Sequence, residues 1–191
     1  HCRLATAGEP HRNVNNHPHS VGDLAMVHNG IISNWEDVKK TEKLPYASEC
    51  DSEAIVRLIA KYRGLGMVES IQKTTELIRG QATFAVLSSQ LGKVWLVKRD
   101  NPLAIAYVPA EKALVFASEK SAILAAFSRT VKLLFRRKTY EFMCEKVEDN
   151  GGFVLTGDEM EAFKVKEPKY GTFTYGGTAY GGSYNQNVPT Y

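Results

Sequence analysis

The cysteines are the first residues of this chain to consider for chemistry, because a thiolate is a strong nucleophile. The chain holds three of them, at Cys2, Cys50 and Cys144. Their odd number and wide spacing favour reduced thiols over a disulfide framework, and we therefore predict a cytoplasmic protein. Cys2 lies next to the N-terminus, but His1 precedes it, so Cys2 has no free α-amine that could act as its base.

Other chemical signals in the sequence are weaker. Four histidines, at positions 11, 17, 19 and 28, suggest a metal site, but the Cys/His spacing of a structural zinc site is absent. A phosphate-binding loop would need a Gly-Lys-Ser/Thr sequence, which the chain lacks. The basic cluster at residues 136–138 is typical of a solvated turn. We expect no metal, no cofactor and no nucleic acid.

Composition and charge are those of an ordinary globular domain. The chain has 191 residues, of which 43% are apolar and 24% are charged, with a formal net charge of +3. A chain of this length can bury a core without disulfides. No apolar run reaches the roughly 18 residues that a membrane span needs, so we expect no membrane partner.

Strands and helices alternate in the first half of the sequence. Short apolar strands are predicted over 2–6 and 24–28, and the second is expected to stop at the turn dipeptide Asn29-Gly30. Asn34 is a candidate cap for a helix over 35–40. Amphipathic helices are predicted to begin at Asp51 or Ser52 and at Val68, and to end at Gly64 and Gly80.

Short strands dominate the sequence after Gly80. The pattern predicts an antiparallel meander, one helix and further strands, over residues 82–89, 94–98, 103–108 and 113–117 (meander), 119–127 (helix), and 131–135, 139–144 and 152–155 (strands). The expected fold class is α+β, with helices packed on antiparallel sheets.

The last residues differ from the rest in composition. We expect a domain over 1–165 and a tail over 166–191. Residues 170–191 carry no charge but five Tyr and five Gly, which is typical of a flexible or partner-ordered segment. Because such a tail could place aromatic anchors in a groove of a neighbouring subunit, we expect a tail partner and an oligomer.

Four segments in register give a more specific signal. They are residues 1–10 (HCRLATAGEP), 14–19 (VNNHPH), 27–34 (VHNGIISN) and 48–53 (SECDSE). Their order and spacing resemble the glutaminase domain of class II glutamine amidotransferases, above all the glucosamine-6-phosphate synthase branch, with amidophosphoribosyltransferase a more distant relative. Weaker similarity continues through residues 78–80 and 116–119, to about residue 150.

This resemblance implies an N-terminal-nucleophile hydrolase fold, an αββα sandwich. The family hydrolyses the side-chain amide of L-glutamine to glutamate and passes the ammonia to a second active site. Its nucleophile is a cysteine at the mature N-terminus, and here that cysteine and the first strands are expected upstream of His1. We therefore expect the chain alone to be inactive. Either an N-terminal segment or a second chain would complete the sheet.

The resemblance also assigns roles to five residues. Arg3 matches the arginine that binds the α-carboxylate of glutamine, and Thr6 matches a residue of the same pocket, although an ordinary strand threonine is an equal alternative. Asn29 and Gly30 match the oxyanion hole, through the side-chain N–H of the first and the backbone N–H of the second. Asp51 matches the carboxylate that pairs with the α-ammonium, and it could also cap a helix.

Two departures leave the acceptor of the ammonia open. Leu4 and Ala7 stand where the synthase branch usually has Trp and His, and an uncharged tail stands where the synthases carry a sugar-phosphate isomerase domain. We therefore expect the acceptor site on another chain, or no such site. Two alternatives also remain: an inactive structural or assembly protein that reuses the fold, and a glutamine-binding sensor without turnover.

Overall fold

The computed structural model describes residues 8–9, 11–108, 111–134, 143–147, 149–157 and 159–167, without the side chains of 128–134 and 143–146. The strand predicted over 2–6 and the tail residues 168–191 lie outside these residues, so both stay predictions.

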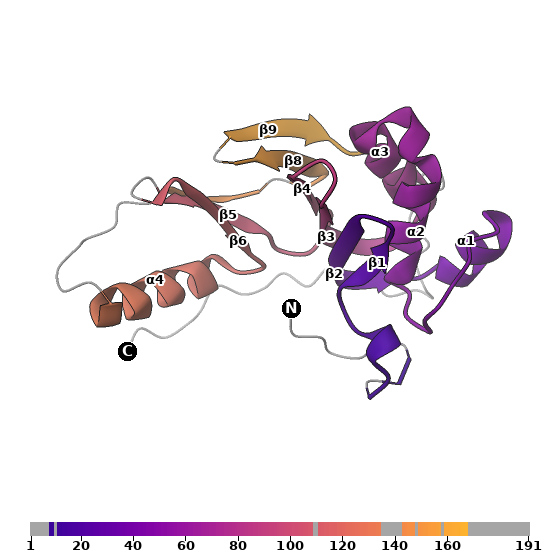
Figure 1. The fold of residues 1–191 in the computed structure, drawn as a ribbon, viewed down its shortest axis with the longest axis horizontal. Coiled ribbons are helices and arrows are strands. Elements are labelled where there is room, and N and C mark those ends of the chain that lie inside the picture. Colours follow the sequence, from indigo (N-terminus) through magenta and orange to yellow (C-terminus); the bar gives the residue numbers. More distant parts are fainter. Residues whose placement is uncertain are drawn as a thin grey trace, which may run out of the picture.

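Two antiparallel sheets form the middle of the molecule (Figure 1). The larger sheet has six strands in the order β1-β2-β3-β4-β8-β9, with the bounds His19–Val21, Leu24–Ile32, Gly80–Ser88, Lys93–Lys98, Gly151–Thr156 and Glu159–Lys164. The smaller sheet has the order β6-β5-β7, with the bounds Ala113–Ala117, Ala104–Val108 and Met143–Lys146.

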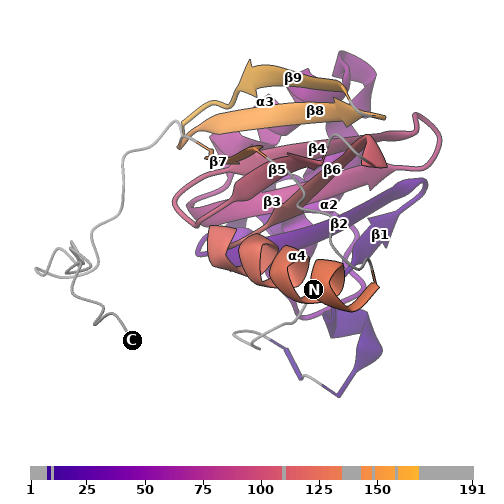
Figure 2. The same cartoon turned by 90° about the vertical axis from the view of Figure 1, so that its left-hand side faces the viewer.

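Helices cover the outer face of each sheet. The helices α1 (Trp35–Thr41), α2 (Glu53–Tyr62) and α3 (Met67–Leu77) lie on the side of the larger sheet, and α4 (Lys120–Leu134) lies across the smaller one (Figures 1 and 2). Two short 3₁₀ helices, Asn13–Asn15 and Arg63–Leu65, complete the described elements. The layers follow the order helix, sheet, sheet, helix, which confirms the predicted αββα fold class.

Three apolar layers hold these elements together. The largest lies between α1–α3 and the six-stranded sheet, and includes Ile55 and Ile59 of α2 with Met26 of β2. The second lies between the two sheets, where Leu96 packs with Ile105. The third lies under α4 and contains Ala104, Ala106 and Ile123. Strands β4 and β5 bury both faces, which is why residues 94–97 and 104–108 are nearly all apolar.

Most predicted elements are present, but three predictions were wrong. Strand β2 does not stop at Asn29-Gly30, because Asn29 pairs with Thr83 and Gly30 with Ala82 of β3. Residues 131–134 belong to α4 and not to a strand, since a short apolar run fits either element. The strands after Gly80 do not form one meander, because β4 and β5 belong to different sheets.

Asn34 is also used differently from the prediction. Its side chain does not cap α1. The carboxamide instead donates to the carbonyl of Leu77 over 3.0 Å and accepts the N–H of Arg79 over 2.7 Å. These bonds tie the start of α1 to the end of α3, a long-range contact that local capping rules do not foresee.

Arg99, just after β4, caps the end of α3. Arg99 is 4% exposed, and its guanidinium donates to the carbonyls of Thr75, Ile78 and Gly80 over 2.8, 3.3 and 2.9 Å. Carbonyls in the last turn of a helix lack partners within the helix, so a cation is well placed there. Burial lowers the pKa of Arg99 from its ordinary value, but arginine stays charged.

We expect Arg99→Met to lower the free energy of unfolding by about 3 kcal/mol, because buried carbonyls lose charge-assisted donors. Urea denaturation followed by circular dichroism measures this change. Arg99→Lys keeps the charge but has fewer N–H donors, so its loss of unfolding free energy should lie between those of wild type and Arg99→Met. A loss below about 0.5 kcal/mol, the range of ordinary surface substitutions, would contradict the capping role.

Candidate functional site

Strands β2 and β3 approach each other closely at Gly30. Gly30 has φ +149°, and a Cβ placed there would lie 2.1 Å from the carbonyl oxygen of Gln81 and 2.8 Å from Nε2 of His28. Gly80 repeats the pattern on the other strand, where a Cβ would lie 2.1 Å from the carbonyl oxygen of Ile31. Glycine is therefore required at both positions, and the backbone of Gly30 is held against β3.

Two hydrogen bonds tie this part of β2 to the beginning of α2. On one side of Asn29 and Gly30, Nδ1 of His28 lies 2.9 Å from Oγ of Ser52. On the other side, the N–H of Ile32 donates to Oδ2 of Asp51 over 2.7 Å. The segment between these bonds is thus fixed at both ends against two successive residues, Asp51 and Ser52.

The partners of His28 decide its tautomer. Nε2 lies 3.0 Å from the carbonyl oxygen of Gln81, which can only accept, so Nε2 carries the proton and Nδ1 accepts from the Ser52 hydroxyl. His28 is 3% exposed, and this burial lowers its pKa although the Gln81 carbonyl and the nearby Asp51 charge act the other way. His28 is therefore a neutral connector between β2, β3 and α2.

Asp51 is buried, with 3% of its surface exposed. Besides the Ile32 N–H, its carboxylate contacts the Cys50 thiol over 3.6 Å. The Ser52 hydroxyl lies 3.5 Å from it, but its one proton goes to the closer Nδ1 of His28. A carboxylate offers about four acceptor positions, so these contacts leave room for a further donor. Cys50 is 2% exposed and faces Asp51, which makes it a packed thiol and not an accessible nucleophile.

Glu53, in the first turn of α2, holds the loop that leads to Asp51. Its carboxylate accepts the N–H of Ala47 (3.0 Å), the N–H and hydroxyl of Ser48 (2.7 and 2.6 Å), and the guanidinium of Arg57 (2.7 Å). Burial by itself would raise the pKa of Glu53, but these bonds outweigh it and hold the pKa below its usual value.

We expect Glu53→Gln to reduce stability by about 2 kcal/mol at neutral pH, because charge-assisted bonds become neutral ones. A carboxyl with a lowered pKa stabilises the fold above its unfolded pKa, near 4.3, and loses that effect as pH falls through the folded value. Urea denaturation at pH 7 and at pH 3 should therefore show a smaller difference between variant and wild type at pH 3. An equal difference at both pH values would contradict this assignment.

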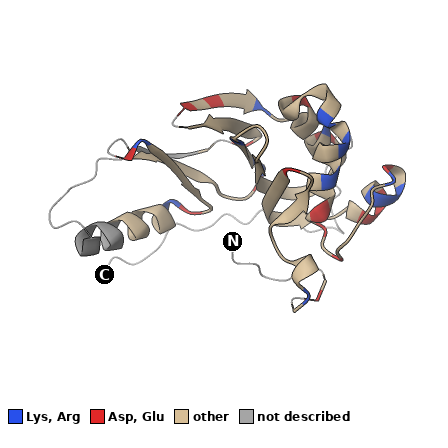
Figure 3. Cartoon of the chain, in the orientation of Figure 1, with Lys and Arg blue, Asp and Glu red and all other residues tan. Residues whose placement is uncertain are grey.

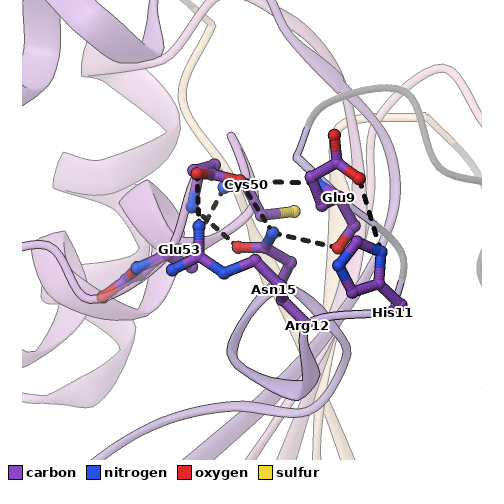
Figure 4. Close-up of polar contacts among 8 residues, drawn as sticks. Glu9, His11, Arg12, Asn15, Cys50 and Glu53 are labelled. Carbon is purple, nitrogen blue, oxygen red and sulfur yellow. Dashed lines mark hydrogen bonds and ion pairs between the residues drawn. The ribbon is translucent and has the colours of Figure 1, made fainter.

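A second cluster ties Glu9, Arg12 and Asn15 to the same loop. The buried Asn15 side chain donates to the Glu9 carbonyl (3.1 Å) and to Oε2 of Glu49 (3.0 Å), and it accepts the N–H of Glu49 (2.9 Å). Arg12 pairs with the other oxygen of Glu49 over 2.5 Å. Figure 4 shows Asn15 between the Glu9 backbone and the loop that carries Cys50. This cluster fixes the segment that follows Arg3 and Thr6 relative to Asp51.

A cleft of about 560 Å³ lies between the two sheets. Residues 27–29 and 83–85 line one wall, and residues 102–103 and 116–118 line the other. The walls are mostly apolar, and the polar residues that line them are His28, Asn29, Thr83 and Ser118. This combination, and this size, are typical of a small-molecule site. Asp51 is not among the described residues that line this cleft.

The structure thus places three of the five predicted site residues in one region. Asn29 lines the cleft, Gly30 follows it on β2, and Asp51 is bonded to Ile32 two residues further on. Arg3 and Thr6 lie outside the described residues. The supporting residues His28, Ser52, Asn15 and Glu53 all lie within the four matching segments, but their supporting roles were not predicted. Only Glu53 shows its partner locally, as a Glu four residues before Arg57 on the same helix.

Acidic and basic residues both occur along α1, α2 and α3 (Figure 3). In the described part of the chain, no helix is both long and apolar enough to cross a membrane.

Comparison with known proteins gives consistent matches. A model of the glutamine amidotransferase domain matches residues 1–125. Glutamine–fructose-6-phosphate aminotransferase (isomerizing) of Aquifex aeolicus is 38% identical over 140 residues, which are 70% of this chain and 23% of that protein. The same enzyme of Methanothermobacter thermautotrophicus is 38% identical over 141 residues, again 70% and 23%. The chain therefore spans about a quarter of the length of these relatives.

Solved structures show the same fold at low sequence identity. Glutamine phosphoribosylpyrophosphate amidotransferase of Bacillus subtilis superposes with a TM-score of 0.58 at 18% identity, over 74% of this chain and 29% of that one. A glutamine aminotransferase class-II domain protein of Silicibacter pomeroyi superposes with a TM-score of 0.57 at 10% identity, over 81% and 72%.

Proposed function

The chain belongs to the glutamine amidotransferase domain family, with an αββα sandwich of the N-terminal-nucleophile hydrolase type, and from this premise we propose that it binds L-glutamine and takes part in hydrolysing its side-chain amide. The product would be glutamate, with release of ammonia. Asn29 and Gly30 form the oxyanion hole of this reaction, and Asp51 holds the α-ammonium of the substrate. Arg3 binds the α-carboxylate and Thr6 lines the same pocket.

One observation carries the proposal: Asn29 lines a cleft, while the neighbouring Gly30 is held by close strand contact and by bonds on both sides. An oxyanion hole needs donors whose positions are set before the reaction, because fixed donors need no reorganisation in the transition state. The bonds from His28 to Ser52 and from Ile32 to Asp51 provide this rigidity.

The nucleophile of the proposed reaction is a cysteine upstream of His1. Its thiolate adds to the amide carbon, and the amide oxygen takes the negative charge facing Asn29 and Gly30. Ammonia leaves with a proton from the base, which is the α-amine of the same N-terminal cysteine and which took that proton from the thiol. Water then hydrolyses the thioester to glutamate. The packing of Cys50 against Asp51 supports a nucleophile from elsewhere.

The test compares the 191-residue chain with the intact protein, meaning the whole gene product including residues upstream of His1. We expect the intact protein to release ammonia and glutamate from L-glutamine at an enzymatic rate, and the chain alone to release none. Turnover by the chain alone would contradict the upstream nucleophile. Glutamine binding without turnover by the intact protein would favour a sensor, and neither binding nor turnover would favour a structural protein.

A further inference from the structure

The peptide group between Asn29 and Gly30 carries the backbone donor of the proposed oxyanion hole. Its carbonyl oxygen, which belongs to Asn29, accepts a hydrogen bond from Nδ2 of Asn101 over 2.8 Å. A trans peptide group is planar, and its C=O and N–H point in opposite directions. A bond that fixes the oxygen therefore also fixes the direction of the Gly30 N–H.

This peptide group needs such a restraint more than most. Gly30 has no Cβ, and glycine permits backbone rotations that other residues do not. Its φ of +149° lies outside the range of ordinary strand residues. A hydrogen bond accepted by the carbonyl also polarises the peptide group, which makes its N–H a stronger donor.

Asn101 is itself held in place by β3. Thr83, the cross-strand partner of Asn29, donates its hydroxyl to the carbonyl of Asn101 over 2.8 Å and accepts the N–H of Arg99 over 3.1 Å. The N–H of Asn101 donates to the Arg99 carbonyl over 3.0 Å. The next residue, Pro102, lines the cleft opposite Asn29. The loop that presents Asn101 is therefore part of the cleft wall.

We propose that Asn101 is a positioning residue that directs the Gly30 N–H toward the oxyanion of the substrate. It acts through the 29–30 peptide group and does not itself contact the reacting atoms. This inference rests on the proposed function, but the bond it depends on is testable without turnover.

The first experiment examines the bond in the 191-residue chain. Asn101→Asp keeps the size of the side chain and removes its donor. We expect the NMR signal of the Gly30 amide proton to move upfield, because the peptide group loses its polarising partner. Asn13→Asp, on the exposed 3₁₀ helix, is the matched control and should leave the Gly30 signal in place. An unchanged Gly30 amide in Asn101→Asp would overturn the proposal.

The second experiment measures glutamine hydrolysis by the intact protein. Asn101→Ala should lower kcat by about 10-fold, a part of the ~10²–10³ that loss of a whole oxyanion donor costs. KM should change by less than about 2-fold, because the uncharged amide of the ground state gains little from the same donor. Asn101→Gln keeps the donor on a longer side chain and should recover most of the loss.

The outcomes separate the two proposals. If wild-type intact protein hydrolyses no glutamine, the proposed function fails, and the NMR result alone judges the Asn101 bond. If wild type is active and Asn101→Ala has wild-type kcat, only the positioning role fails. A loss confined to KM, or a loss that Asn101→Gln does not recover at all, would also overturn it.

Discussion

Replacing Gly30 with alanine is expected to lower glutamine hydrolysis by the intact protein by at least about 100-fold, the effect of losing one oxyanion donor. The new Cβ would stand 2.1 Å from the carbonyl oxygen of Gln81 and 2.8 Å from Nε2 of His28. Neither neighbour can move freely, because both belong to the β2–β3 contact. The strand must shift, and the Gly30 N–H moves with it. Ammonia release at saturating L-glutamine measures the effect.

Two further variants separate this clash from a general loss of structure. Gly92→Ala is the matched control, because Gly92 also has a positive φ, of +61°, but has open space where the Cβ would be placed. It should cost about 1–2 kcal/mol of stability and leave turnover unchanged. Asn29→Ala removes the side-chain donor without any backbone clash and should also lower kcat by about 100-fold. Turnover within 3-fold of wild type in a folded Gly30→Ala protein would refute the assignment.

Replacing Asp51 with asparagine is expected to raise the KM for L-glutamine by roughly 30-fold, which corresponds to about 2 kcal/mol for one charge-assisted bond. The asparagine oxygen can still accept the Ile32 N–H, so β2 stays tied to α2. Only the negative charge is lost, and with it the attraction for the α-ammonium of the substrate. Steady-state kinetics over a range of glutamine concentrations measures the change.

A substrate without the α-amine provides the control for Asp51. Glutaramic acid keeps the side-chain amide and the carboxylate of glutamine but has no ammonium group. Wild type and Asp51→Asn should bind glutaramic acid about equally. In a thermodynamic cycle of the two proteins with the two substrates, the coupling energy between Asp51 and the α-amine should then equal the whole loss of glutamine affinity in Asp51→Asn. If both compounds lose affinity equally in Asp51→Asn, the residue supports the fold and does not bind the amine.

The sequence predicts the helices around this site well, because their signal is local. The apolar spacing of Ala54, Ile55, Leu58 and Ile59 predicts α2, and all four side chains are fully buried. The dipeptide Asn29-Gly30 predicts a turn, because it is typical of turns. Pairing with Thr83 and Ala82, more than fifty residues away in sequence, overrides that local preference.

Only the site residues that belong to the family motifs could be predicted from the sequence. The motifs identify Asn29, Gly30 and Asp51, but they do not contain the bonds that fix these residues. His28 reaches both Ser52 and Gln81, and Asn101 reaches Asn29, across sequence distances that no local pattern encodes. These hydrogen bonds depend on the tertiary fold, so they can be identified only from the structure.

A crystal structure of the intact protein with L-glutamate, the expected product, tests the central claim most directly. The γ-carboxylate of glutamate occupies the place of the amide during the reaction. We predict one of its oxygens at about 2.7–3.1 Å from both Nδ2 of Asn29 and the Gly30 nitrogen, with the α-ammonium against Asp51. A glutamate bound elsewhere, or an Asp51 that stays covered with the ligand in place, would contradict the account.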